Sequence, residues 1–157
     1  MKPIAIILMG SYSDMDHAKK IYSELEKFGI EYKVRIGSAH KTAEHVIGIL
    51  KEYEAMERPK VYITIAGRSN ALSGFVDGFV LAPTIACPPY SESFSGADIY
   101  SSLRMPSGVS PALILEPKNA ALLAARIFSV YDSNIKNAVK NYMQANAEKI
   151  IEDDKRI

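Results

Sequence analysis

The sequence predicts an α/β protein whose central parallel sheet is covered by helices on both faces. Apolar, β-branched segments that suit buried strands alternate with segments whose apolar residues recur every three or four positions, as in amphipathic helices. This alternation indicates parallel strands joined by right-handed crossovers. At 157 residues the chain has the length of one domain, and residues 1–157 are assigned to a single domain.

The first half of the chain shows the alternation most clearly. Gly29 is a good stop for the first helix, and Ser13 or Asp14 could cap its start. The expected strands cover residues 3–9, 31–36 and 60–66, and the expected helices cover about residues 15–28, 43–56 and 72–79.

The predicted elements of the second half are shorter. Strands are expected over residues 83–86 and 112–115, and helices over about residues 97–103, 119–130 and 133–154. Cys87-Pro88-Pro89 ends the first of these strands, because proline has no amide hydrogen for a sheet. The last helix follows a completed sheet, yet Ile135, Val139 and Ile150 belong to an apolar stripe. That stripe is expected to be buried on its own domain or on another subunit.

Composition and charge argue against several classes of function. Nineteen basic and eighteen acidic residues give a net charge of +1, so nothing indicates binding to nucleic acid or to a membrane surface. The chain has no signal-like start and no apolar run of about 18 residues. Cys87 is the only cysteine and has no partner for an internal disulfide, which fits a reducing compartment. A cytoplasmic protein is therefore expected.

Polar loops follow the first three predicted strands, and the second of them contains His40. Histidine can pass a proton at neutral pH, so the hypothesis is that His40 moves a proton on a phosphorylated small molecule. The alternative is a histidine that caps or packs a helix. Because ligands bind at the carboxyl ends of parallel strands, all three loops are expected to face one site. They are Gly10-Ser11-Tyr12-Ser13-Asp14, Ser38-Ala39-His40-Lys41 and Ala66-Gly67-Arg68-Ser69-Asn70.

Each loop offers groups that could bind such a molecule. The hydroxyls of Ser11 and Ser13 and the carboxylate of Asp14 precede a helix N-terminus, which favours anions, and a carboxylate suits a ribose diol. Lys41 can bind a phosphate as a point charge. Arg68 could bind an anion or pair across a subunit interface. Taken singly, these features also fit plain caps, tight turns and solvated surface side chains.

Other chemistries lack their motifs. Neither the phosphate-loop pattern G-x-x-x-x-G-K-[ST] nor the dinucleotide pattern G-x-G-x-x-G occurs. His17, His40 and His45 have no metal-ligand spacing with Cys87 or with one another. His17 and His45 are interpreted as surface or packing residues, and Cys87, with no evident base beside it, as a small buried hydrophobe. Neither a cofactor nor a metal is expected.

Together and in this order, the motifs resemble the phosphoribosylaminoimidazole (AIR) carboxylase family of purine biosynthesis. Besides the three loops, the matches are Cys87-Pro88-Pro89, Ser101-Ser102-Leu103-Arg104-x-Pro106-Ser107-Gly108 and Ala124-Ala125-Arg126-Ile127-Phe128. One branch of the family is a mutase, with Ala-Gly-Gly-Ala-Ala-His-Leu-Pro-Gly at the third loop and arginine in place of Lys41. This chain departs from that pattern at both places and resembles the branch that carboxylates AIR directly with carbon dioxide.

The resemblance implies a flavodoxin-like, three-layer α/β/α sandwich with a C-terminal helix, residues 133–154, used in a homo-oligomer that is usually an octamer. It implies reversible carboxylation of AIR to 4-carboxy-AIR with His40 as the catalytic residue. It also implies that Ser11, Ser13, Asp14, Ser38 and Lys41 contact the nucleotide, and that Ala66, Gly67 and Ser69 line the pocket for carbon dioxide and the carboxylate.

Two alternatives stay open at this point. One is mutase activity on the same scaffold, in which a carboxyl group moves from N5 to C4 of carboxyaminoimidazole ribonucleotide. The other is a flavodoxin-like binding or receiver module without catalysis. A receiver requires acidic residues after its first strand and an aspartate at the end of its third, where this chain has Gly10-Ser11 and Ala66-Gly67.

Overall fold

Five parallel strands form the centre of the molecule in the order β2-β1-β3-β4-β5, in a computed structural model that describes all 157 residues. The three strands of the chain's first half end level with one another, since Met9 of β1 pairs with Ile36 of β2 and with Ile65 of β3. The loops that follow these strands therefore leave the sheet at the same edge. The strands are β1 (Ile4–Met9), β2 (Glu31–Ile36), β3 (Lys60–Ile65), β4 (Thr84–Ala86) and β5 (Ala112–Leu113).

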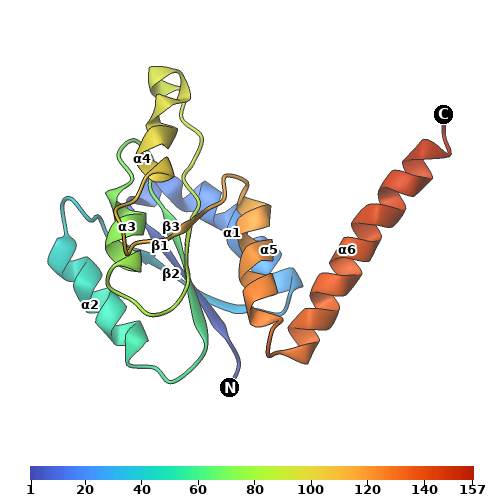
Figure 1. Cartoon of the computed structure of the whole chain (residues 1–157), viewed down its shortest axis with the longest axis horizontal. Helices are drawn as coiled ribbons and strands as arrows, with labels where there is room; N and C mark the ends of the chain where they lie inside the picture. The colour runs from blue at the N-terminus through green and yellow to red at the C-terminus, as the bar shows by residue number, and fades with distance from the viewer.

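Helices cover both faces of the sheet and complete three layers (Figure 1). One face packs against α1 and α5, and the other packs against α2 and α3. The predicted fold class, a flavodoxin-like α/β/α sandwich, is confirmed. The helices are α1 (Met15–Lys27), α2 (Ala43–Glu54), α3 (Ala71–Asp77), α4 (Tyr100–Leu103), α5 (Pro117–Phe128) and α6 (Ser133–Asp154), with short 3-10 helices η1 (Tyr12–Asp14) and η2 (Ser93–Ile99).

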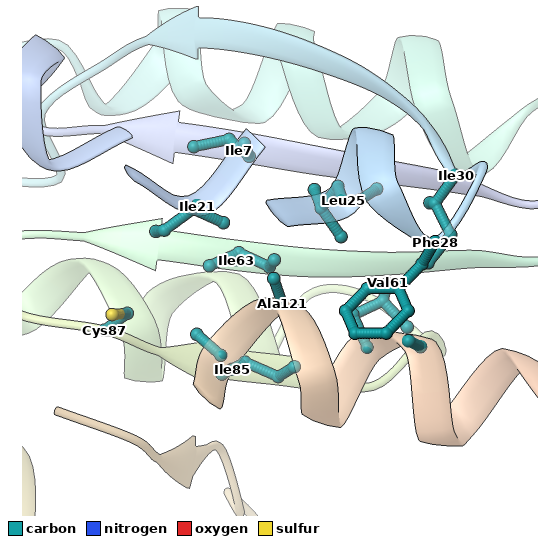
Figure 2. Close-up of a cluster of buried hydrophobic side chains, with 14 of the residues drawn as sticks. Ile7, Ile21, Leu25, Phe28, Ile30, Val61, Ile63, Ile85, Cys87 and Ala121 are labelled. Carbon is teal, nitrogen blue, oxygen red and sulfur yellow. The ribbon is translucent and has the colours of Figure 1, made fainter. Parts of the chain in front are cut away.

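The hydrophobic core lies on both faces of β1, whose six residues are all buried. Alternate side chains of a strand point to opposite faces, so Ile7 packs on the α1/α5 side and Ile6 on the α2/α3 side. Figure 2 shows the first of these clusters, in which Ile7 and Ile63 of the sheet lie beside Leu25 of α1. Burial of one such isoleucine side chain contributes about 1.5–3 kcal/mol.

The structure differs from the sequence-based boundaries mainly in the second half. The fifth strand has only two residues, because β4 offers it just Ile85 and Ala86 as partners. The single helix expected over residues 97–103 is a 3-10 helix followed by one turn of α-helix. The chain is left-handed at Phe94, Ser95 and Gly96 before that turn.

Helix α6 begins at a cap and ends away from the rest of the chain (Figure 1). Asp132 caps it by accepting hydrogen bonds from the amides of Asn134 and Ile135, at 2.9 and 3.1 Å. Ile135 and Val139 in its first half are buried in the core, whereas Ile150 and Ile151 in its second half are exposed. No helix combines the length and the apolar character that a membrane span needs.

Candidate active site

A cleft of about 560 Å³ lies at the carboxyl edge of the sheet, among the loops that follow β1, β2, β3 and β4. The level ends of the first three strands bring these loops together. A slightly larger hollow of about 660 Å³ lies elsewhere, beside Lys60 at the start of β3, and contains none of the predicted site residues. All nine predicted residues line the cleft: Ser11, Ser13, Asp14, Ser38, His40, Lys41, Ala66, Gly67 and Ser69.

The first loop places the hydroxyls of Ser11 and Ser13 just before the N-terminus of α1. The amide of Gly10 donates to the Ile65 carbonyl at 2.9 Å, which ties the loop to the end of β3. Ser11 Oγ accepts from the amide of Ser13 at 3.3 Å and from its hydroxyl at 3.0 Å. Ser11 therefore caps η1, while Asp14 occupies the expected N-cap position of α1 without a side-chain hydrogen bond to the helix. Partial burial raises the pKa of the Asp14 carboxyl.

The second loop is closed by its own side chains. The amide of Ser38 donates to Thr42 Oγ1 at 2.9 Å, and the amide of Lys41 donates to Ser38 Oγ at 3.3 Å. These bonds cap the turn without His40, whose side chain is exposed at the cleft. Gly37 precedes the loop because space is lacking there: a Cβ on it would lie 2.7 Å from Cγ2 of Val46.

The third loop depends on α4. Asn70 is buried, and its Oδ1 accepts from the amide of Ser73, so it caps α3. Asn70 Nδ2 donates to Ser102 Oγ at 2.9 Å, and its amide donates to Ser101 Oγ at 3.0 Å. Arg68 in the same loop lies in the left-handed region at φ 59°, a conformation that costs energy for a residue other than glycine. Asn70 is thus structural, and the exposed Arg68 side chain lies at the cleft.

The turn after β4 forms a wall of the cleft, although none of its residues was among the predicted site residues. Pro89 lies against the third loop, so closely that a Cβ on Gly67 would be 3.3 Å from its Cγ. A second cavity of about 200 Å³ lies behind this contact, lined by Pro88, Ile99 and Leu115 and by residues shared with the cleft. The available signal was Cys87-Pro88-Pro89 itself, which ends a strand at the same edge as the other loops.

Cys87 has a neighbour that the sequence did not indicate. Nε2 of His17 lies 3.1 Å from the Cys87 carbonyl oxygen and 3.4 Å from its Sγ. Of the two roles expected for His17, surface or packing, the half-buried side chain has the packing one, and Cys87 is buried as expected. Burial raises the pKa of the Cys87 thiol to about 12 and lowers the pKa of His17, so both side chains are neutral at pH 7. His, Cys, Asp and Glu side chains nowhere form a group of three suited to a metal ion.

Known proteins resemble this chain over its whole length. A phosphoribosylaminoimidazole carboxylase of Treponema denticola is 76% identical over 157 residues, which is 100% of this chain and 99% of that protein. One of Archaeoglobus fulgidus is 52% identical over 98% of this chain and 84% of its own length. The crystal structure of Treponema denticola PurE, 76% identical, superposes with a TM-score of 0.98 over 99% of both chains.

The family model described as AIR carboxylase matches residues 4–149. That match covers every strand, the four loops of the cleft and most of α6. It also agrees with the resemblance that the loop motifs indicate. This chain belongs to the AIR carboxylase family.

Proposed function

We propose that this protein catalyses the reversible carboxylation of AIR by carbon dioxide to 4-carboxy-AIR in purine biosynthesis. Family membership and the 76% identity to a phosphoribosylaminoimidazole carboxylase support an enzyme of this class. One observation carries the assignment to this cleft: a single hollow of about 560 Å³ gathers a histidine, hydroxyls, a carboxylate and an ammonium group from three loops. Such a set suits a phosphorylated ribose linked to a reactive ring.

His40 is proposed to move the proton of the reaction. The amino group of AIR makes its ring carbon C4 nucleophilic, and C4 attacks the carbon of carbon dioxide to form the new carbon–carbon bond. The intermediate still carries a hydrogen on C4. The His40 imidazole takes this proton, the C–H electron pair returns to the ring, and aromaticity is restored; the reverse reaction delivers the proton to C4. Proton transfer of this kind contributes roughly 10²–10⁴ in rate.

The first two loops are proposed to hold the nucleotide. The exposed hydroxyls of Ser11 and Ser13 and the carboxylate of Asp14 stand where η1 leads into α1, and the positive end of a helix favours a phosphate. The Lys41 ammonium adds a charge of the right sign. Ser38 accepts a hydrogen bond from the Lys41 amide and is half-buried beside them.

The third loop is proposed to hold carbon dioxide and the developing carboxylate at Ala66, Gly67 and Ser69. Carbon dioxide is small and uncharged, so it needs a dry hollow of the right shape and donors for the negative charge that forms on its oxygens. Ala66 and Gly67 line both the cleft and the second cavity, so they lie where the open and the more enclosed space meet. Neither this chemistry nor any motif in the chain calls for a cofactor.

The reaction is tested with purified protein, AIR and bicarbonate, without ATP, by following 4-carboxy-AIR. Product formation is expected, with no conversion of N5-carboxy-AIR beyond its spontaneous breakdown to AIR. Conversion of N5-carboxy-AIR without release of free AIR would make the protein a mutase and overturn the proposal. Absence of both reactions would favour a flavodoxin-like binding protein without catalysis. A test for bound flavin would then examine that alternative.

We also propose that residues 1–157 form one domain that assembles as a homo-oligomer, an octamer, through the helix at 133–154. Exposed apolar residues in the second half of α6 support this, since Ile150 and Ile151 keep 71% and 56% of their surface accessible. Light scattering after size-exclusion chromatography measures the assembly. The double variant Ile150→Lys, Ile151→Lys is expected to lower the mass, whereas Asn141→Lys, at an exposed polar position, is not.

The unpaired thiol of Cys87 fits a cytoplasmic location.

A further inference from the structure

A single side chain links α1 to the turn after β4 across 70 positions of the sequence. Nε2 of His17 lies 3.1 Å from the carbonyl oxygen of Cys87. A carbonyl oxygen can only accept a hydrogen bond, so Nε2 carries the hydrogen and donates it. The same nitrogen lies 3.4 Å from Cys87 Sγ, so the imidazole contacts both the main chain and the side chain of Cys87.

The His17 bond supplies a donor that the sheet does not provide. The Cys87 amide still belongs to the ladder and donates to the Thr64 carbonyl at 2.8 Å. No backbone amide donates to the Cys87 carbonyl, because the ladder with β5 ends at the bond from Ile114 to Ala86. Buried carbonyl groups are nearly always paired, and an unpaired one is costly. His17 therefore supplies the hydrogen bond to this carbonyl at the point where the chain leaves β4.

The residues that follow Cys87 shape the part of the cleft assigned to carbon dioxide. Pro88 lines the second cavity, and Pro89 lines both that cavity and the cleft. The Pro89 ring is packed against the third loop. If Gly67 carried a Cβ, that atom would lie only 3.3 Å from Pro89 Cγ. A change in the direction of the Cys87 carbonyl therefore reaches Gly67 through two rigid rings.

On the basis of the carboxylase function proposed above, we propose that His17 is a positioning residue for the carbon dioxide end of the site. Its Nε2–H holds the Cys87 carbonyl and thereby holds Pro88 and Pro89 against the third loop. His17 lines neither the cleft nor the second cavity, so it acts through the turn and not on the substrates. The groups proposed for the nucleotide belong to other loops, which are closed by hydrogen bonds of their own.

Because His17 holds only the turn beside the carbon dioxide end, its loss should affect the two substrates differently. Carbon dioxide has no charge and few atoms, so its capture depends on the shape of the hollow, and a misplacement of about 1 Å can cost on the order of 10²-fold. AIR is held by its phosphate and ribose at the first two loops. Loss of the His17 bond should therefore change the KM for carbon dioxide and leave the KM for AIR nearly unchanged.

The test compares four variants by steady-state kinetics, with bicarbonate varied at saturating AIR in the presence of carbonic anhydrase, and then with AIR varied. His17→Leu removes the donor and is expected to raise the KM for carbon dioxide roughly tenfold. His17→Gln keeps a donor near the place of Nε2 and should restore most of the wild-type value. His17→Asn is polar but too short, so it should behave like leucine. His45→Leu changes an exposed histidine on α2 outside the cleft and should match the wild type.

A second readout does not depend on catalysis. If the turn loosens in His17→Leu and His17→Asn, iodoacetamide should modify Cys87 in the folded protein about tenfold faster than in the wild type or in His17→Gln. Wild-type protein that fails to carboxylate AIR would refute the proposed function alone, and Cys87 protection would still decide the role of His17 in the turn. A wild-type KM for carbon dioxide in both His17→Leu and His17→Asn, or an equal defect in His17→Gln, overturns the inference.

Discussion

The side-chain hydrogen bonds that close the loops after β1 and β2 come from the loops' own residues, whereas the side chain that holds the turn after β4 comes from another part of the chain. In the first two loops the closing hydrogen bonds join residues two to four positions apart, such as Ser13 to Ser11 and Ser38 to Thr42. The Cys87 turn is held by His17, 70 positions away. The first kind of bond needs only residues of the loop itself, and the second needs α1 packed beside the end of β4.

This difference separates two parts of the proposed reaction. The loops after β1 and β2 carry the residue proposed for proton transfer and the groups proposed for the nucleotide, and the turn held by His17 lines the space proposed for carbon dioxide. The third loop lies between these cases, because Asn70 caps α3 locally but also bonds to Ser101 and Ser102 about 30 positions away. Changes in the two regions should therefore have different consequences.

The largest effect is expected from His40→Asn. The variant should keep the fold and the affinity for AIR, because the loop is closed by Ser38 and Thr42, but turnover should fall by roughly 10²–10⁴ when the proton acceptor is lost. Steady-state rates and AIR binding by calorimetry measure the two properties separately. His45→Asn serves as the matched control on the exposed face of α2. Wild-type turnover in His40→Asn would remove His40 from the mechanism.

The next effect concerns the reactivity of Cys87. Burial raises its pKa from 9.0 to about 12, so the folded thiol is protonated at pH 8 and its thiolate is scarcer, on the order of 10³-fold, than in the unfolded chain. Iodoacetamide should label Cys87 in urea and leave the native protein nearly unlabelled over the same time, as mass spectrometry would show. Equal labelling rates in the two states would mean that the turn after β4 is open in solution.

A smaller effect tests the tight approach behind the second loop. Gly37→Ala should destabilise the protein by about 1–3 kcal/mol, because the new Cβ would lie 2.7 Å from Val46 Cγ2 and α2 would have to shift. Gly48 lies within α2, and a Cβ there would meet no atom within 4 Å. Gly48→Ala should therefore stabilise the protein by about 0.5–1 kcal/mol. Urea unfolding gives both values. A neutral Gly37→Ala would show that the loop after β2 is less rigid than its packing indicates.

The smallest effect is the pH dependence that His17 contributes. Burial is the main cause of its lowered pKa, with a smaller lowering from Lys20, while the Cys87 carbonyl and Glu116 raise it. Below the ordinary value of 6.5 the unfolded chain therefore takes up a proton that folded His17 does not, so stability should fall as the pH drops from 6.5 toward the native pKa. Urea unfolding at several pH values should show a shallower fall in His17→Gln. Identical slopes in the two proteins would mean that His17 is not buried in solution.

Much of the fold was predictable because it follows from local patterns. The run of six buried residues in β1 and the spacing of apolar residues in α1 allow few other arrangements. The shorter elements of the second half were less predictable. Residues 93–103 depend on three left-handed residues that no periodicity indicates, and β5 has only the length that β4 allows.

The sequence by itself determined the order of strands and helices, the polar loops at the strand ends and the family to which the motifs point. These properties depend on neighbours within a few positions, and the rules for parallel sheets then bring the loops to one edge. Only the tertiary structure decided what lies between the loops: the cleft and its smaller neighbour, the contact of Pro89 with Gly67, and the bond from His17 to Cys87. Such contacts join distant segments, and their geometry is set by how helices pack on the sheet, which no local pattern records.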